Sequence, residues 1–461
     1  MNASPSALRQ VARGAASLGL INVAAMAVTF LVGVLLARYL GPAGYGVYAI
    51  AMTVTAFAGM VTEFGLPALA TREFGAAQAH ARWGEARGLL HWGDRTVLAI
   101  SGVLVIVVAA GGRLIPVADR SAFVASMVWA VLLIPVVAVA KLRGAALLAL
   151  GRTVAGQMPV LLLRPMLFVL SLSLAWMVLG IAPSPAGAMA MQVVAATGAL
   201  LVVAVNYRRH RPEALAQAPR VNHWRRWIAV SIPMGMTEGL RLLQGQMALL
   251  ILGVFSTSAA AGLYRVADSA LGVCLVFYNV LSVVTGPTFA RLYVRGEVDE
   301  LAKVMRTTSA VMLVGTFALG LPVVAIGPWL FGFAFGSEFA PSGSVFVVLW
   351  IGALASAVTG PINVYANMTG GERVVVAGVA VAVVVNAAAA LLLVPHLHEI
   401  GAAIATSAGL IAWNVVTYAR IRQRDGVGMT ALGLRPHHVR RALDVVRYRG
   451  NMKPEVRDRE Q

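Results

Sequence analysis

The sequence has little cysteine, little lysine and few charges, and each shortage excludes a class of protein. Cys274 is the one cysteine in 461 residues, so a disulfide within the chain and a cysteine-based metal site are excluded. None of the three lysines, Lys141, Lys303 and Lys453, follows a glycine, and this excludes a Walker A nucleotide loop. The stretch HLHE at 396–399 lacks the HExxH spacing of zinc hydrolases. We therefore expect no catalytic residues, no metal site and no cofactor.

The shortage of charge indicates a membrane protein. Charged residues make up 12% of the chain, against about 25% in soluble proteins, while 59% of residues are hydrophobic and the mean hydropathy is +0.79. The formal net charge of +18 would suggest a nucleic-acid partner in a soluble protein. Here the topology of a membrane protein explains most of it, and we expect no nucleic-acid partner.

The hydrophobic pattern predicts an all-α integral membrane protein with twelve transmembrane helices. Each predicted span is about 19–28 residues long and is bounded by Gly, Pro or charged residues. We expect proline kinks at Pro135, Pro159, Pro165 and Pro233. The spans cover residues 15–38, 43–66, 89–111, 122–140, 154–181, 185–206, 227–254, 259–286, 307–327, 343–365, 374–394 and 400–419.

The basic residues predict the orientation. Only three of the 37 Lys and Arg residues, Arg38, Arg113 and Arg120, fall on one side of the predicted spans, and nearly all the rest lie on the other side. By the positive-inside rule both termini are cytoplasmic. The amino end leads through Arg9 and Arg13 into an apolar segment that is too long for a signal peptide.

The largest inner loop divides the chain into two halves. We predict an N-terminal six-helix lobe over 1–206, a cytoplasmic linker over 207–226, a C-terminal six-helix lobe over 227–419 and a basic cytoplasmic tail over 420–461. In the tail we expect a solvated segment in which a short helix can contact anionic lipid.

The two halves also share short motifs. Gly46-Val47-Tyr48 and Gly262-Leu263-Tyr264 are 216 positions apart and follow equivalent outer loops. Because both halves start on the inner side, the pattern predicts a parallel repeat around a central cavity, with the two halves related by an axis along the membrane normal.

Charged residues deep in the spans mark the candidate site. From Trp227, Glu238 lies roughly 16 Å and Arg241 roughly 21 Å along the helix, well inside a ~30 Å hydrocarbon layer. Such residues face a protein interior or a water-filled path, and their i, i+3 spacing lets them neutralise each other in part. A structural ion pair between helices is the alternative to a transport site.

A second group of polar residues joins this candidate site. Arg164 lies roughly 15 Å into the fifth span, and Arg265 and Asp268 repeat the i, i+3 spacing in the eighth. The group has an excess of positive charge, which suits an anionic head group because arginine pairs with phosphate through two hydrogen bonds. We predict substrate binding by Arg164, Arg241, Arg265, Gln244 and Asn279, ion coupling or charge balance by Glu238 and Asp268, and anchoring of the lobe ends by Arg38, Glu63 and Arg72.

Several motifs give the chain a family resemblance. They are ARYLGPAGYGVY at 37–48 continuing through EFGL at 63–66, AGLY at 261–264, FGSEF at 335–339 and GAAIAT at 401–406. With these motifs the chain resembles the polysaccharide transporter family, the Wzx-type oligosaccharide flippases of the multidrug/oligosaccharidyl-lipid/polysaccharide exporter superfamily. It departs from the family at Gln246, where an Asp is common, so ion coupling is not carried over to that position.

The resemblance implies two six-helix lobes, alternating access and a cationic cavity. It also implies a flippase that moves undecaprenyl-pyrophosphate-linked oligosaccharide repeat units across a bacterial inner membrane for exopolysaccharide or O-antigen-type biosynthesis. The implied partners are the lipid-linked oligosaccharide, membrane lipids, a polysaccharide polymerase and glycosyltransferases, and the energy source is an H⁺ or Na⁺ gradient.

Three other functions stay open at this point. A multidrug extruder of the same superfamily would share the fold and export amphipathic cations. A membrane-bound glycan polymerase or ligase is disfavoured by the short outer loops. A scaffold that transports nothing is disfavoured by the deep charges.

Overall fold

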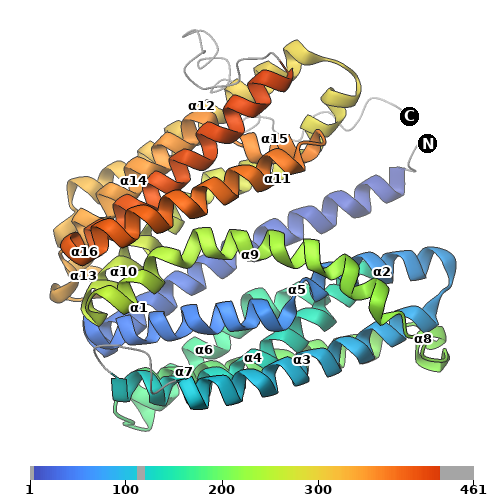
Figure 1. The fold of residues 1–461 in the computed structure, drawn as a ribbon, viewed down its shortest axis with the longest axis horizontal. Coiled ribbons are helices and arrows are strands. Elements are labelled where there is room, and N and C mark those ends of the chain that lie inside the picture. Colours follow the sequence, from blue (N-terminus) through green and yellow to red (C-terminus); the bar gives the residue numbers. More distant parts are fainter. Residues whose placement is uncertain (1–4, 112–119, 426–461) are drawn as a thin grey trace, which may run out of the picture. The chain divides into compact units, whose positions relative to one another are not determined.

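The computed structural model of the protein describes residues 5–111 and 120–425, and every regular element in these two ranges is a helix (Figure 1). The elements in chain order are α1 (Pro5–Glu63), α2 (Leu66–His80), α3 (Trp83–Gly111), α4 (Arg120–Ala149), α5 (Thr153–Met158), η1 (Pro159–Leu163), α6 (Arg164–Ser173), η2 (Leu174–Val178), α7 (Pro185–His210), α8 (Glu213–Gln217), α9 (Trp224–Phe255), α10 (Ser258–Cys274), α11 (Val276–Val294), α12 (Val298–Ala325), α13 (Gly327–Phe335), η3 (Ser337–Phe339), α14 (Ser342–Thr359), α15 (Ile362–Met368) and α16 (Glu372–Asp425).

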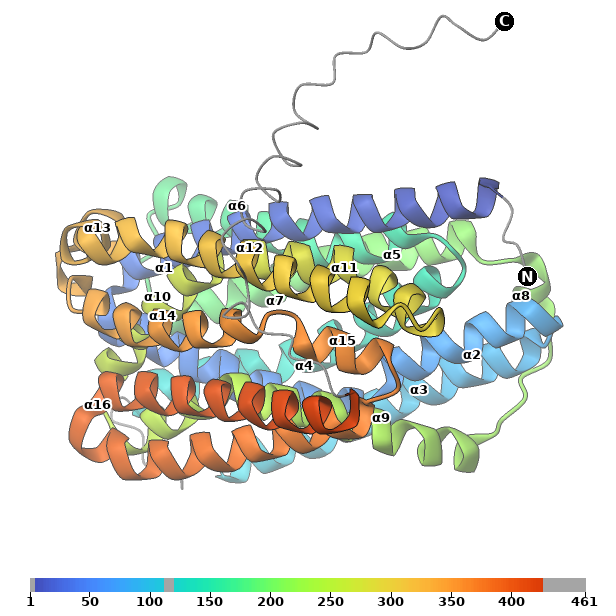
Figure 2. The same cartoon turned by 90° about the horizontal axis from the view of Figure 1, so that it is seen from above.

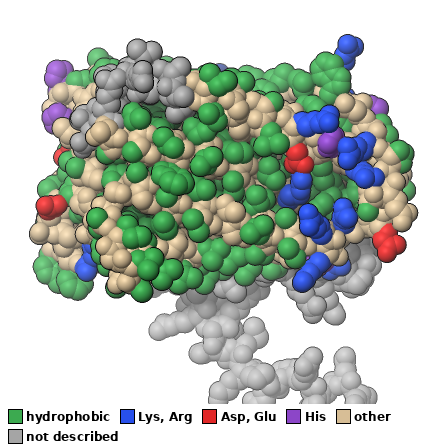
Figure 3. Space-filling model, turned by 90° about the horizontal axis from the view of Figure 1, so that it is seen from below, with side chains coloured by type: hydrophobic (Ala, Val, Ile, Leu, Met, Phe, Trp, Pro, Cys, Tyr) green, Lys and Arg blue, Asp and Glu red, His purple; other side chains and the backbone are tan. Residues whose placement is uncertain are grey.

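The surface of these helices is that of a membrane protein. In the described ranges nine helices are long and apolar enough to cross a membrane, or ten if the bent pair α10 and α11 is one span. Large apolar side chains such as Leu98, Ile106, Leu132 and Leu201 are exposed. Figure 3 shows hydrophobic side chains over most of one face, with Lys and Arg gathered toward one end. The prediction of an all-helical, multi-pass integral membrane protein is therefore confirmed.

Helices α1 and α16 are too long to be single spans. At ~1.5 Å per residue, the 59 residues of α1 would extend about 90 Å, three times the hydrocarbon thickness. Both are interrupted by one non-helical residue, Gly41 (φ 64°) in α1 and His398 (φ 46°) in α16. Figure 1 shows the chain turning back within α1. The two breaks fall between ranges that the sequence predicts as separate spans.

The four prolines at which kinks are predicted differ in their local structure. Pro159 opens a π-helical turn, η1, and Pro165 is the second residue of α6, which follows it, so the fifth predicted span is irregular at this point. A π-turn inserts one extra residue per turn and rotates the following side chains. By contrast, Pro135 and Pro233 lie inside the continuous helices α4 and α9. The irregular turn places Arg164, the first residue of α6.

The described helices divide into two compact units. Of the described residues, unit 1 comprises 5–111, 120–273, 323–349 and 383–409, and unit 2 comprises 274–322, 350–382 and 410–425. In unit 1, α2 and α3 lie side by side (Figures 1 and 2). Trp227 of α9 is fully buried in a cluster with side chains of α2, α3, α4 and α7. In unit 2, Tyr365 of α15 packs edge-on against Phe289 of α11 and donates a hydrogen bond to Asp425 at the end of α16.

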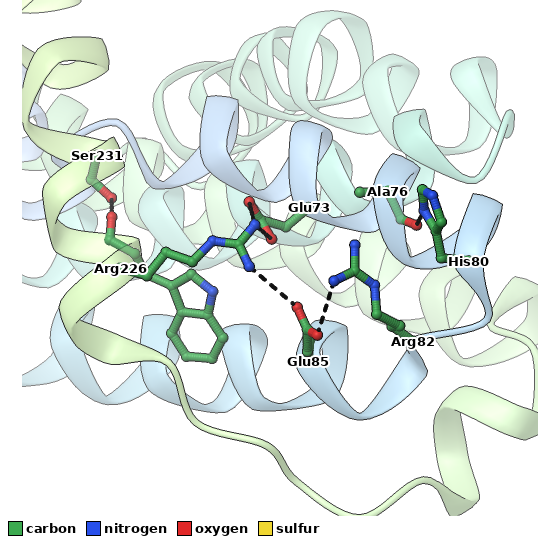
Figure 4. Close-up of polar contacts among 8 residues, drawn as sticks. Glu73, Ala76, His80, Arg82, Glu85, Arg226 and Ser231 are labelled. Atoms are coloured by element: carbon green, nitrogen blue, oxygen red, sulfur yellow. Dashed lines mark hydrogen bonds and ion pairs between the residues drawn. The ribbon is translucent and has the colours of Figure 1, made fainter.

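The segment predicted as a cytoplasmic linker, 207–226, is docked onto unit 1. Leu215 of α8 is 2% exposed within the Trp227 cluster, and the Val221 N–H donates to the Gly84 carbonyl at 3.1 Å. Figure 4 shows the end of the segment, where Arg226 lies between Glu73 and Glu85 at 3.4 and 3.7 Å. Apolar burial and ion pairs thus hold the start of α9 against α2 and α3.

The repeated motifs are in reciprocal contact. A Cβ added to Gly46 would overlap the carbonyl oxygen of Ser258, and one added to Gly262 would overlap that of Pro42. Positions 42 and 258 are 216 residues apart, as are positions 46 and 262. The contact of Gly46 with Ser258 is therefore repeated between the equivalent residues of the two motifs, Gly262 and Pro42. Such reciprocity is a property of interfaces around a two-fold axis.

The tyrosines of the repeated motifs are placed alike. The Tyr48 hydroxyl accepts a hydrogen bond from Gln192 of α7 at 2.8 Å, and the Tyr264 hydroxyl shares one with Thr406 of α16 at 2.9 Å. Both partners lie in the sixth predicted span of their own half.

Some predictions lie outside what the structure describes. The basic tail from 426 onward and Arg113 lie outside the described residues. The division of the chain into two lobes at 207–226 stays a prediction.

Candidate functional site

A cavity of about 590 Å³ lies within unit 1 among α1, α2, α4, the α5–α6 region and α9. This volume lies within the range of small-molecule sites, about 300–1,000 Å³. Most of its lining is apolar, with Met52, Met60 and Ile134 among the side chains. The polar residues that line it are Thr55, Glu63, Thr71, Lys141, Gln157, Arg164 and Glu238.

Arg164 is the deep cation of this cavity. Its Nη2 donates to Gln192 Oε1 at 3.2 Å, and the Gln192 amide in turn donates to the Tyr48 hydroxyl. Among residues 5–111 and 120–425, no carboxylate lies within 4.0 Å of the Arg164 guanidinium. A guanidinium has five N–H donors, so one amide contact leaves most of them free for a ligand. The placement suits the binding of an anion.

Glu63 and Lys141 form an ion pair on the wall of the same cavity. Lys141 Nζ lies 2.8 Å from Oε1 and 3.0 Å from Oε2 of Glu63. Glu63 is the last residue of α1 and Lys141 lies in α4, so the pair joins two helices. The sequence predicts Glu63 as an anchor of the lobe end; the structure also places it in the cavity.

Glu238 lines the cavity from α9, but Arg241 does not. Both side chains are exposed and no ion pair joins them, although their i, i+3 spacing permits one. Positions three apart on a helix differ by about 60° in direction, so two long side chains can turn to different surfaces. The cavity therefore brings together Arg164 and Glu238 of the predicted site and leaves Arg241 outside.

The other pair with this spacing does form. Arg265 Nη1 lies 3.1 Å from Asp268 Oδ2, and neither residue lines the cavity. Tyr45 lies within hydrogen-bonding reach of Arg265 and stacks on Tyr48 with ring centroids 6.2 Å apart. A chain of polar and aromatic contacts thus runs from Arg164 through Gln192, Tyr48 and Tyr45 to Arg265.

The remaining predicted residues lie elsewhere. In unit 1 the Gln244 carbonyl accepts from Asn386 at 3.3 Å, and Arg38 donates to the carbonyls of Phe333 and Ala334 as an anchor would. Asn279 of unit 2 and Arg72 of α2 are exposed. Their predicted roles stay predictions.

Three site residues were missed from the sequence. Lys141 stands just past a predicted span end and reads as an interface residue there, although it is one of only three lysines. Gln192 is the one amide in the middle of a largely apolar span, and this was the available signal for it. Tyr48 belongs to the repeated motif, which gave no indication of its hydroxyl's partner.

The contact between Gln192 and Arg164 leads to a prediction. We expect Gln192→Glu to abolish most anion-dependent transport, because the new carboxylate would lie about where Oε1 now lies, 3.2 Å from the guanidinium, and would neutralise it. Gln192→Met, which has a similar shape and no charge, should lose much less. Transport of an anionic lipid by reconstituted protein measures both. Equal losses in the two variants would contradict a role for the free charge of Arg164.

The fold itself is that of a class of membrane transporters. The structure is similar to the inward-facing conformation of a multidrug resistance MATE family transporter of the MOP superfamily (TM-score 0.70, 12% identity, covering 88% of this chain and 98% of that one). It is also similar to the lipid II flippase MurJ in an inward closed conformation (0.66, 12%, 94% and 93%) and to a MOP superfamily transporter from Pyrococcus furiosus (0.58, 14%, 90% and 95%). At such identities the likeness defines the fold.

The sequence identifies the family. A model of the polysaccharide biosynthesis protein family matches residues 11–293, which is more than half of the chain, and the protein belongs to this family. No curated protein matches the sequence. The family resemblance predicted from the motifs is confirmed, and the fold is shared with transporters of the MOP superfamily.

Proposed function

We propose that the protein is a flippase that moves undecaprenyl-pyrophosphate-linked oligosaccharide repeat units from the inner to the outer leaflet of a bacterial inner membrane. The observation that carries this proposal is the cavity cation Arg164, whose guanidinium has no carboxylate partner among the described residues. A pyrophosphate is a dianion of suitable geometry for a guanidinium. Family membership and the MurJ-like fold support a lipid-linked precursor of polysaccharide as the cargo.

In this proposal two six-helix lobes, 1–206 and 227–419, alternate in access around the substrate, with both termini cytoplasmic. The breaks at Gly41 and His398 support twelve spans, and the reciprocal contacts of Gly46 and Gly262 support a parallel repeat. Arg164 binds the pyrophosphate in the cavity. Arg241, Arg265, Gln244 and Asn279 do not line this cavity, and their part in binding the substrate is proposed from the sequence. Glu238 and Asp268 balance the charge and serve in coupling to H⁺ or Na⁺. The products would pass to a polysaccharide polymerase, while glycosyltransferases supply the substrate.

A cation extruder is the second candidate. Glu238 presents to the same cavity a carboxylate with no ion-pair partner in the described structure, and the fold is similar to MATE transporters. The two functions differ in the charge of the cargo. An amphipathic cation would use Glu238 and would be repelled by Arg164, whereas an anionic head group would do the reverse.

Reconstitution tests the proposal. We expect liposomes that contain the purified protein to flip a fluorescent undecaprenyl-pyrophosphate-linked oligosaccharide, faster with an imposed H⁺ or Na⁺ gradient, and to leave an ethidium-type cation untransported. Transport of the cation alone would replace the flippase by an extruder. Transport of neither would remove both.

A further inference from the structure

The cavity holds four titratable side chains, each from a different helix. Glu63 comes from α1, Lys141 from α4, Arg164 from α6 and Glu238 from α9. Two of them, Glu63 and Lys141, are paired with each other, while Arg164 and Glu238 have no ion-pair partner in the part of the chain that the structure describes. An anion that enters the cavity therefore meets one free cation and one cation that a carboxylate already holds.

The Glu63–Lys141 pair is suited to a change of partner by Lys141, as a comparison with a second ion pair on α4 indicates. Two residues further on, Arg143 holds Asp94 through two hydrogen bonds of 2.9 and 2.6 Å, lies over the Tyr207 ring and does not line the cavity. Such a bidentate, stacked arginine is a fixed structural pair. Lys141 is a mobile point charge whose side chain is 44% exposed, against 16% for Glu63. The ammonium is thus the accessible partner.

We propose that Lys141 is a second phosphate ligand and that Glu63 is a further ion-coupling carboxylate, in addition to Glu238 and Asp268, which is released when Lys141 turns to the phosphate. This deepens the proposed function and rests on it. The substrate phosphate takes the ammonium from Glu63, and the carboxylate left in the cavity takes up one H⁺ or Na⁺. The cation balances the charge that the exchange would otherwise leave unpaired among apolar walls.

The exchange links the two bound species. A cation on Glu63 releases Lys141 and so favours the phosphate, and by reciprocity the phosphate favours the cation. Lowering the pH or raising the Na⁺ concentration should therefore tighten phosphate binding. Arg164 and Glu238 face the same space, and neither is consumed by the exchange.

The test measures binding of undecaprenyl pyrophosphate to the full-length protein in neutral-lipid nanodiscs, with undecaprenol as the uncharged competitor. Because Lys141 is held by Glu63, we expect Glu63→Gln to bind the probe about 5- to 150-fold more tightly than the wild type at neutral pH, and to lose the dependence on H⁺ or Na⁺. Lys141→Gln should bind more weakly and lose the same dependence. The two single variants thus shift affinity in opposite directions.

The outcome separates exchange from a structural role. A merely structural ion pair predicts a shift in the same direction in both variants, and this result would overturn the exchange, as would wild-type cation dependence in Glu63→Gln. The matched controls are Glu300→Gln and Lys303→Gln, which break an exposed Glu–Lys pair at the start of α12 and should change nothing. A wild type that does not bind the probe would overturn the proposed function itself, and the exchange with it.

Discussion

Replacing Arg164 by alanine is expected to abolish polysaccharide export while leaving the protein in the membrane. The substitution removes a cavity cation that has no carboxylate partner within the described ranges, and in these ranges only Gln192 loses a hydrogen bond. Truncating one partner of a buried charge pair costs about 2–5 kcal/mol, so the affinity for a pyrophosphate should fall by about 30-fold or more. Export in cells that depend on this chain, together with its abundance in the membrane fraction, measures the effect.

Three further variants serve as controls for the Arg164→Ala result. Arg164→Lys keeps the charge but loses bidentate geometry, and should retain part of the transport. Arg295→Ala removes a 63% exposed arginine at the end of α11 and should have no effect. Arg241→Ala is predicted from the sequence to abolish transport as well. Because Arg241 lies outside the cavity lining, normal transport by Arg241→Ala would assign the phosphate to the cavity alone, whereas normal transport by Arg164→Ala would remove the proposed binding site.

The fold could be predicted from the sequence because a membrane leaves few choices. Every backbone polar group in the hydrocarbon layer must be paired within the protein, so long apolar segments are helices. The breaks within α1 and α16 also fall between two apolar runs. In α1 the runs are separated by Gly41 and Pro42, and in α16 by a polar turn at His398. The docking of 207–226 could not be predicted, because it depends on one buried leucine and on ion pairs with distant helices.

The site could be predicted only in part, since spacing permits a contact without requiring it. Glu238 and Arg241 have the same i, i+3 spacing as Arg265 and Asp268, yet only the second pair forms. Glu63 and Lys141 are 78 positions apart, and each stands at the end of a span where an interface anchor is the ordinary interpretation. Their pairing follows from how α1 and α4 pack, which no local pattern records.

Replacing Gly46 by alanine is expected to have the second large effect, on assembly and not on binding. An added methyl group would overlap the Ser258 carbonyl oxygen, which is backbone and cannot turn aside, so the helices must separate. Overpacking of this kind costs about 1–3 kcal/mol or more. We expect a lower unfolding temperature in detergent and less protein in the membrane.

The reciprocal geometry makes this prediction stricter. Gly262→Ala would overlap the Pro42 carbonyl in the same way, so the two variants should be destabilised to a similar degree although they lie in different halves of the sequence. Gly102→Ala is the matched control, because no atom outside its own helix lies within 4 Å of the added carbon and alanine favours the helix. If Gly46→Ala were as stable as Gly102→Ala, the two motifs would not be in contact, and the two-fold arrangement of the halves would lose its main structural support.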